Sequence, residues 1–356
     1  MPLNFIARLE SARLSLDAGR PDRALLLLAG AFPPAINAEI FFVRGEALRA
    51  QGFFRRAEES YRRALRELGK EECDLLTGAW LGLARCARSL GEIGPAKEAM
   101  RRARAQAGRD MREILALEDA LVERAAGRYG PALRALAPLL RSSRQCKDWS
   151  AVGFILWATG GARRFSGDLS GAHRDFRDSL SAFRRAGDTE GRIYALFGLG
   201  GIARVRGLFG EARRAYSQAG RLLAASPDLF GRAYAHCGLA NVLRQLGLLS
   251  EAESHYRRSH VLYSRLDDRV DLAYVDWGLG QIHLKRGKLA LAERHLRLAL
   301  KAFTDGGEAR GEALSLMSLS QVLHARGRTA QAEKFFDAAV KCSRRAGLHA
   351  HLEIFT

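Results

Sequence analysis

Arginine side chains recur at regular distances along this sequence of 356 residues. The series consists of Arg49, Arg88, Arg124, Arg164, Arg204 and Arg244. A guanidinium group can donate two parallel hydrogen bonds to a carboxylate or a phosphate, and it can stack on an aromatic ring. A fold that brought the six groups to one surface would therefore bind an acidic segment of a partner molecule.

Aromatic and carboxamide side chains recur in register with these arginines. They are Tyr194, Tyr234 and Tyr274, Trp157 and Trp277, and Asn241, Gln281 and Gln321. Carboxamides can hydrogen-bond a peptide backbone, and aromatic rings can hold the apolar side chains of a ligand. Together with the arginines they suit an extended acidic peptide, in which each charge-assisted hydrogen bond shielded from water contributes roughly 1.5–3 kcal/mol.

The register of these side chains comes from a repeat of glycine and alanine. Nine glycines are each followed five residues later by an alanine, and the pairs are Gly19/Ala24, Gly52/Ala57, Gly91/Ala96, Gly127/Ala132, Gly167/Ala172, Gly207/Ala212, Gly247/Ala252, Gly287/Ala292 and Gly327/Ala332. Successive glycines are 33, 39 and 36 residues apart and then 40 residues apart five times. A glycine can end a helix and an alanine lets a second helix approach closely, so each pair indicates the turn of a helical hairpin.

Apolar spacing on both sides of the glycine predicts two helices in each unit. Before Gly207, apolar residues recur at Ile193, Leu196, Leu199 and Ile202. After it they recur at Phe209, Ala212, Tyr216 and Ala219. Both series have helical spacing. The arginine, aromatic and carboxamide positions lie three, four and three residues apart in the first helix, so they form one stripe along it.

The pattern resembles the tetratricopeptide repeat, whose signature is W-x2-L-G-x2-Y, then A-x3-F and then P. The best match consists of Leu199-Gly200, Gly207, Ala212, Tyr216 and Ala219. The 40-residue period, with Asn241 after a Leu-Ala pair, resembles the Leu-Gly-Asn-repeat subgroup. The resemblance implies an all-α, right-handed superhelical solenoid of about nine helix-turn-helix repeats with a short C-terminal capping helix. It also implies that the first helices line the concave wall and present their stripe to a ligand.

The resemblance covers nearly the whole chain and predicts one solenoid over residues 1–356. The four units over residues 1–150 are less regular, and the five units over residues 151–345 keep the 40-residue period. Residues 346–356 are expected to form the capping segment, because the last unit of a solenoid cannot bury its own face. No segment remains for a separate catalytic or DNA-binding domain.

Composition limits the partners and the compartment. The net charge of +18 favours an acidic partner, although arginine could equally be the solubilising residue of this chain. The five cysteines are scattered without a CxxC pair, which predicts a reducing compartment without disulfides or zinc. No stretch approaches ~20 uninterrupted apolar residues, so we expect a cytoplasmic protein without membrane insertion. No catalytic, cofactor-binding or metal-binding constellation is recognisable.

The leading hypothesis is a non-enzymatic adaptor that holds an acidic peptide or protein segment along its concave groove. One alternative is RNA or another nucleic acid, with the tyrosines stacking on bases. Another is a regulator that senses a signalling peptide, or a protein that assembles with copies of itself. The arginine series could also be a solvated edge, and the aromatic residues could pack against the preceding unit.

Overall fold

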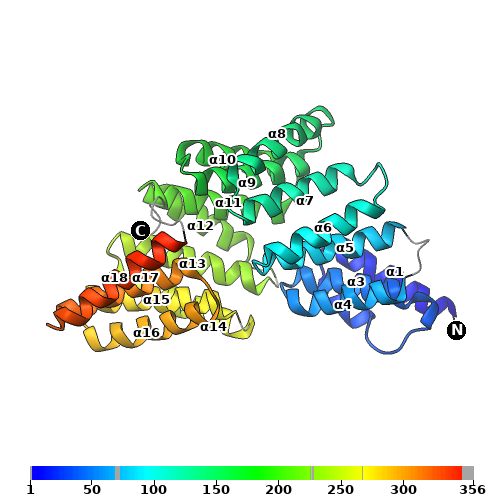
Figure 1. Cartoon of the computed structure of the whole chain (residues 1–356). Coiled ribbons are helices and arrows are strands. Elements are labelled where there is room, and N and C mark those ends of the chain that lie inside the picture. Colours follow the sequence, from blue (N-terminus) through cyan, green and yellow to red (C-terminus); the bar gives the residue numbers. More distant parts are fainter. Residues whose placement is uncertain (1, 69–72, 225, 227, 267, 347–356) are drawn as a thin grey trace. The chain divides into compact units, whose positions relative to one another are not determined.

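The computed structural model consists of stacked helical hairpins (Figure 1). It describes residues 2–68, 73–224, 226, 228–266 and 268–346. Within these residues there are 18 α-helices, one 3-10 helix and no strand. The helices follow one another as nine pairs in chain order, so the prediction of an all-α fold of helix-turn-helix units is confirmed.

The chain divides into two compact units, Met1–Arg141 and Ser142–Thr356. The helices of unit 1 are α1 (Pro2–Asp17), α2 (Pro21–Leu27), α3 (Asn37–Ala50), α4 (Phe54–Glu67), α5 (Cys73–Ser89), α6 (Ile93–Gln106) and α7 (Arg112–Ala125), with the 3-10 helix η1 (Pro34–Ile36) before α3. The division falls within α8 (Tyr129–Gln145). One continuous solenoid over residues 1–356 stays a prediction, and the predicted capping helix lies, from residue 347 on, outside the described residues.

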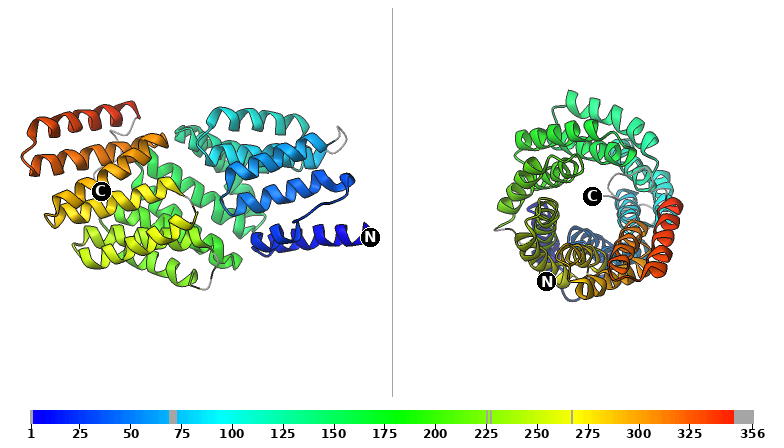
Figure 2. Two further views of the ribbon diagram at one scale, coloured as in Figure 1. Left: turned by 90° about the horizontal axis from the view of Figure 1, so that it is seen from below. Right: turned by 90° about the vertical axis from the view of Figure 1, so that its left-hand side faces the viewer.

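Unit 2 contains five hairpins of similar length, stacked in chain order (Figure 2). Their helices are α9 (Trp149–Ser166), α10 (Leu169–Ala186), α11 (Thr189–Val205), α12 (Phe209–Leu222), α13 (Leu229–Gln245), α14 (Leu249–Leu266), α15 (Arg269–Lys285), α16 (Leu289–Asp305), α17 (Ala309–Ala325) and α18 (Thr329–Arg345). Each first helix contacts the first helix of the next hairpin, so α9, α11, α13, α15 and α17 form a continuous layer. The second helices form the other layer.

Local sequence signals fix where the helices of unit 2 begin and turn. Asp228, the N-cap of α13, accepts a hydrogen bond from the backbone N–H of Gly231 at 2.8 Å. This contact satisfies one of the backbone donors that a helix leaves unpaired at its start. Gly207, between α11 and α12, has a φ of 75°, a conformation that costs glycine little because it has no Cβ. The predicted glycine turns therefore lie where the sequence places them.

The hairpins pack together through large side chains of the second helices. These side chains contact glycines of the first helices. The Tyr216 ring of α12 is 3% exposed and lies against Gly200 of its own hairpin and Gly238 of the next one. A Cβ atom added to Gly238 would be 2.2 Å from this ring. The same arrangement recurs one repeat later, where a Cβ atom on Gly278 would be 2.3 Å from the Tyr256 ring. The glycines therefore set how closely successive first helices approach.

Substituting Gly238→Ala should lower the free energy of unfolding by about 2 kcal/mol, because the buried ring has no room for a methyl group. Gly220→Ala is the matched control, since its added Cβ atom would be 4.0 Å from the nearest atom, the Ala235 Cβ. We expect the control to be neutral or slightly stabilising. Urea unfolding followed by circular dichroism measures both changes, and equal stabilities of the two variants would contradict the packing described.

Candidate functional site

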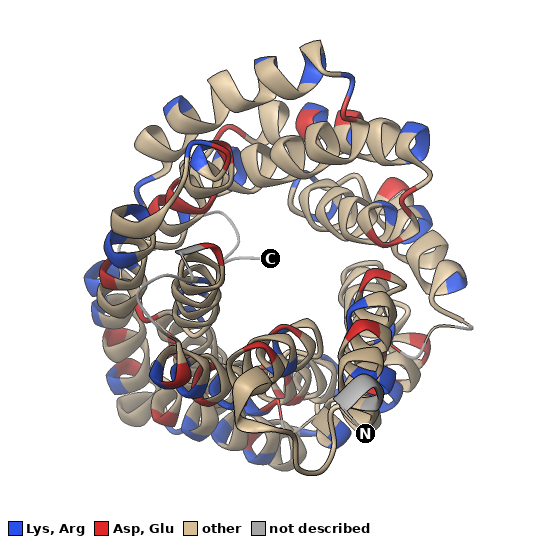
Figure 3. Cartoon of the chain, turned by 90° about the vertical axis from the view of Figure 1, so that its right-hand side faces the viewer, with Lys and Arg blue, Asp and Glu red and all other residues tan. Residues whose placement is uncertain are grey.

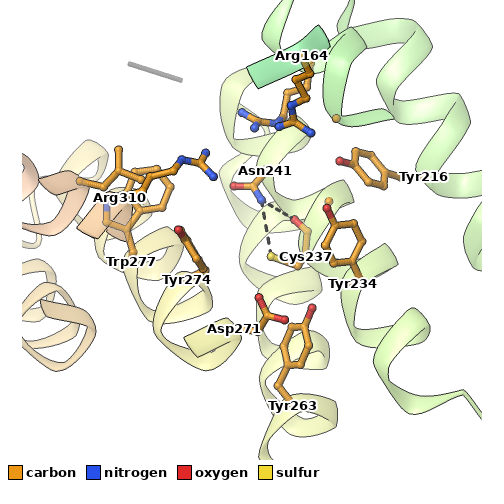
Figure 4. A pocket seen from close by; sticks show the side chains of 14 residues that line it. Arg164, Tyr216, Tyr234, Cys237, Asn241, Tyr263, Asp271, Tyr274, Trp277 and Arg310 are labelled. Carbon is orange, nitrogen blue, oxygen red and sulfur yellow. Dashed lines mark hydrogen bonds between the residues drawn. The ribbon is translucent and has the colours of Figure 1, made fainter. Parts of the chain in front are cut away.

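A cavity of about 220 Å3 lies in unit 2, within the layer of first helices (Figure 4). The residues that line it are Arg164, Gly201, Arg204, Tyr216, Tyr234, Cys237, Gly238, Asn241, Tyr263, Asp271, Tyr274, Trp277, Arg310 and Leu314. All five first helices of the unit contribute, from α9 to α17, and Tyr216 and Tyr263 come from the second helices α12 and α14. Residues one repeat apart in the sequence thus share one wall.

Three arginines from three different hairpins line the cavity. The Arg164 guanidinium lies over Gly201 of α11, where an added Cβ atom would be 2.8 Å from the Arg164 Nη1 atom. Arg204 lies on α11 itself and is 9% exposed. Arg310 of α17 lies with its guanidinium carbon 5.8 Å from the centre of the Tyr274 ring. Partial removal of these cations from water strengthens their interaction with an anionic ligand.

A hydrogen-bonded chain holds Asn241 at the cavity wall. The Asn241 Nδ2 atom donates to the Cys237 carbonyl at 3.0 Å, and the Tyr256 hydroxyl donates to the Asn241 Oδ1 atom at 2.9 Å. Arg244 Nε donates to the Tyr256 hydroxyl at 3.3 Å, and the guanidinium carbon of Arg244 is 5.0 Å from the centre of the Trp277 ring. Arg244 is buried behind the wall and positions Asn241 rather than lining the cavity.

Asp271 is the acidic side chain among the residues that line the cavity. It lies in the first turn of α15, where its backbone N–H donates to the N-cap carboxylate of Asp268 at 3.0 Å. Burial, the neighbouring Asp268 and the more distant Glu308 raise the pKa of Asp271 to about 7, against a hydrogen bond with the Tyr263 hydroxyl that lowers it. The folded protein therefore favours the protonated form of Asp271 more than water does.

The cavity brings together six of the side chains that the sequence analysis selected. They are Arg164, Arg204, Tyr234, Asn241, Tyr274 and Trp277.

Three arginines of the series lie in unit 1, and two of them pair with acidic groups there. Arg49 pairs with Glu46 at 2.6 Å, and Arg88 pairs with Glu118 at 2.5 Å. Arg124 also lies in unit 1, where burial and the positive charge of Arg88 lower its pKa to about 10.

The remaining selected side chains of unit 2 lie outside the cavity lining. Tyr194 packs between Trp157 and Phe197, with ring centres 6.3 and 6.2 Å apart. Gln281 donates to the Ser318 Oγ atom at 2.6 Å. Gln321 of α17 is exposed. These aromatic and glutamine side chains make packing and hydrogen-bonding contacts between neighbouring hairpins or face solvent, so their part in ligand binding stays a prediction.

Eight lining residues were not selected from the sequence, among them Tyr216, Tyr263, Asp271 and Arg310. Tyr216 and Tyr263 lie on second helices, which the stripe argument did not include. Arg310 lies in the first turn of α17, outside the stripe position at which the other arginines recur. Asp271 could have been found from the sequence, because it replaces a glycine or alanine at its place in the repeat.

Basic side chains are not confined to the cavity. Figure 3 shows Lys and Arg on helices throughout the chain. On the second helices of unit 2, Arg177, Arg214 and Arg221 are exposed. The positive charge of unit 2 is therefore carried by partly buried arginines of the cavity and by dispersed arginines that face solvent.

The described residues form neither a membrane-spanning helix nor a metal-binding cluster. None of their helices has both the length and the apolar character needed to span a lipid bilayer. In the same part of the chain, no three His, Cys, Asp or Glu side chains lie together in a way that could hold a metal ion. The expected cytoplasmic location stays a prediction.

Stacked two-helix units with glycine contacts between them define a helical-repeat protein. A tetratricopeptide repeat family model matches residues 231–305 and 271–345, and a tetratricopeptide repeat-like domain model matches residues 2–78. These matches cover more than half of the chain, which therefore belongs to the tetratricopeptide-repeat proteins. The predicted family is confirmed, and membership of the Leu-Gly-Asn subgroup stays a prediction.

Several solved structures share this fold at low sequence identity. A Rap protein complexed with competence and sporulation factor has a TM-score of 0.70 at 10% identity, over 96% of this chain and 98% of that one. The apo form of the quorum sensor NprR from B. thuringiensis has a TM-score of 0.62 at 12% identity, over 94% and 97%. BtubC from P. vanneervenii has a TM-score of 0.51 at 18% identity, over 62% and 92%. No curated protein matches the chain in sequence.

Substituting Asp271→Asn should raise the melting temperature at pH 8 by roughly 2–4 °C and by less at pH 5. The pKa of Asp271 is raised from its usual value of 3.8 to about 7 in the folded state. The wild-type protein therefore loses stability as the pH rises from about 4 to about 7. Asparagine does not ionise and avoids that loss. The matched control is Asp337→Asn, which removes a carboxylate from an exposed position of α18. If Asp271→Asn had a lower melting temperature than the wild type at pH 8, this would contradict a raised pKa of Asp271 in the folded protein.

Proposed function

We propose that this protein is a non-enzymatic interaction scaffold that binds an acidic peptide or protein segment in the cavity of unit 2. The observation that carries the proposal is the convergence of Arg164, Arg204 and Arg310 from three hairpins on one cavity. Guanidinium groups recognise carboxylates through paired hydrogen bonds. Asn241, held in place by Tyr256, adds an amide group suited to the backbone of a bound peptide.

The size of the cavity indicates what part of the ligand it receives. Its volume of about 220 Å3 is below the roughly 300–1,000 Å3 of pockets that enclose a drug-sized molecule. We therefore expect it to hold one or two side chains of a longer segment, whose remaining residues lie along the first helices. The net charge of +18 would also speed the approach of an acidic ligand, an effect that salt weakens.

A peptide-sensing regulator is a second candidate for the function. The observation that favours it is the fold shared with the quorum sensor NprR and with a Rap protein solved with competence and sporulation factor. In this case the ligand would be a free peptide rather than a segment of a folded partner. The same cavity and the same arginines serve both candidates, so one set of variants tests them together.

The triple variant Arg164→Gln, Arg204→Gln, Arg310→Gln should bind acidic peptides at least about tenfold more weakly than the wild type, because each arginine contributes a charge-assisted hydrogen bond. The measurement is binding of purified protein to an array of decapeptides of acidic, neutral or basic composition. The matched control is Arg177→Gln, Arg214→Gln, Arg221→Gln, which removes the same charge from exposed positions of α10 and α12. We expect the control to lose less than about threefold.

An equal loss in both triple variants, with circular dichroism showing intact helices, would contradict the proposed cavity and indicate that dispersed charge binds the peptides. Stronger binding of the wild type to single-stranded RNA than to any peptide class, with a steep salt dependence, would favour the nucleic-acid alternative instead. A free peptide that shifts the melting temperature on its own would favour the peptide-sensing candidate.

A further inference from the structure

Asp271 departs from the pattern of its own repeat. The third residue after the N-cap of the first helix is small in the four other hairpins of unit 2, where it is Ala151, Gly191, Gly231 or Gly311. In each hairpin the backbone N–H of this residue donates to the N-cap carboxylate. The capping contact is therefore the same in all five hairpins, and it does not require an aspartate at position 271.

The second helix that precedes α15, which is α14, also departs from the pattern of its repeat. The corresponding position of the preceding second helix is apolar in three hairpins, where it is Phe183, Leu223 or Phe303. A Cβ atom added to Gly191 would be 2.2 Å from the Phe183 ring, so ring and glycine fit together. Between α14 and α15 the pair is Tyr263 and Asp271, whose side chains share a hydrogen bond. Two polar groups thus replace an apolar contact at matching positions.

The ionised form of Asp271 lowers the stability of the unliganded fold. The charged groups that act on Asp271 include Asp268 and Glu308, which carry the same sign. Burial and these carboxylates together favour its protonated form. In a chain with a net charge of +18, a carboxyl group placed beside two others is not explained by stability. Residues that break a structural pattern at such a cost are often found at binding sites.

The cavity wall carries both cationic and anionic side chains. In Figure 4, Arg164 and Asp271 lie on opposite sides of Asn241. The charges of both Arg164 and Asp271 act on the pKa of Tyr234, so both groups lie near its hydroxyl. A ligand that occupied the whole cavity would therefore meet the Arg164 guanidinium on one side of Asn241 and the Asp271 carboxyl group on the other.

We infer that Asp271, together with Tyr263, receives a positively charged nitrogen of the same ligand whose carboxylates pair with Arg164, Arg204 and Arg310. The inference rests on the proposed function and specifies the class of ligand. That class is a peptide segment in which a basic group lies close to acidic residues. The basic group is either a lysine or arginine side chain or a free amino terminus, since both supply N–H donors with a positive charge.

The test uses the double variant Tyr263→Phe, Asp271→Gly, which recreates the phenylalanine–glycine pair found at Phe183/Gly191 and Phe303/Gly311 and is therefore expected to fold. The probe is an array of decapeptides tethered through their carboxyl ends. One set is acidic and acetylated, a second is acidic and acetylated with one lysine, and a third is acidic with a free amino terminus. The control is Asp276→Asn, which removes a carboxylate of α15 that pairs with His295 and does not line the cavity.

We expect the wild type and the control to prefer the second or third set over the first by about tenfold, and the double variant to lose this preference. The set preferred by the wild type identifies the source of the cation. The double variant should still prefer acidic over neutral peptides, because the arginines are unchanged.

Two results would overturn the inference while leaving the proposed function intact. One is equal binding of the three acidic sets by the wild type, and the other is an undiminished preference in the folded double variant. A wild-type protein that does not prefer acidic over neutral peptides would instead refute the proposed function, and the inference would fall with it. The arginine triple variant separates the two contributions. It should lose the preference for acidic over neutral peptides and keep the preference for peptides that carry a basic group.

Discussion

The structure of unit 2 depends on one packing contact that recurs between hairpins. In it, a large side chain of a second helix packs against a glycine in the first helix of the following hairpin. Tyr216 on Gly238 and Tyr256 on Gly278 are successive copies of this contact. Because glycine has no side chain, the helices approach closely and the first helices form a continuous layer. This layer brings residues that are 40 positions apart in the sequence to the same wall, which makes a shared cavity feasible.

The same use of glycine shapes the cavity itself. Gly201 leaves the space over α11 in which the Arg164 guanidinium lies, and a Cβ atom there would be 2.8 Å from the Arg164 Nη1 atom. Arg244 shows a contrasting use of the same residue type. It is buried against Trp277 and bonded to Tyr256, so it supports the wall that carries Asn241. Arginines at one repeat position thus line the cavity or support its wall according to their neighbours.

Departures from the repeat are more informative about function here than the repeat itself. The glycines and apolar residues explain stacking, and stacking needs no charge. Asp271 and Tyr263 interrupt an apolar contact that other hairpins retain, and they do so inside the cavity. We propose that this polar pair is retained because a basic group of a bound ligand pairs with it.

The sequence by itself determined the helices, the turns and the family. Glycine and alanine at a fixed distance, with helical apolar spacing, predict helical hairpins. The side chains selected along the first helices already included six of the cavity residues. Only the tertiary structure decided that Arg49 and Arg88 pair with Glu46 and Glu118, and that Tyr216 and Tyr263 reach the cavity from second helices. A period fixes the face on which a side chain lies, but its contacts depend on the neighbouring helix and on the acidic groups placed there.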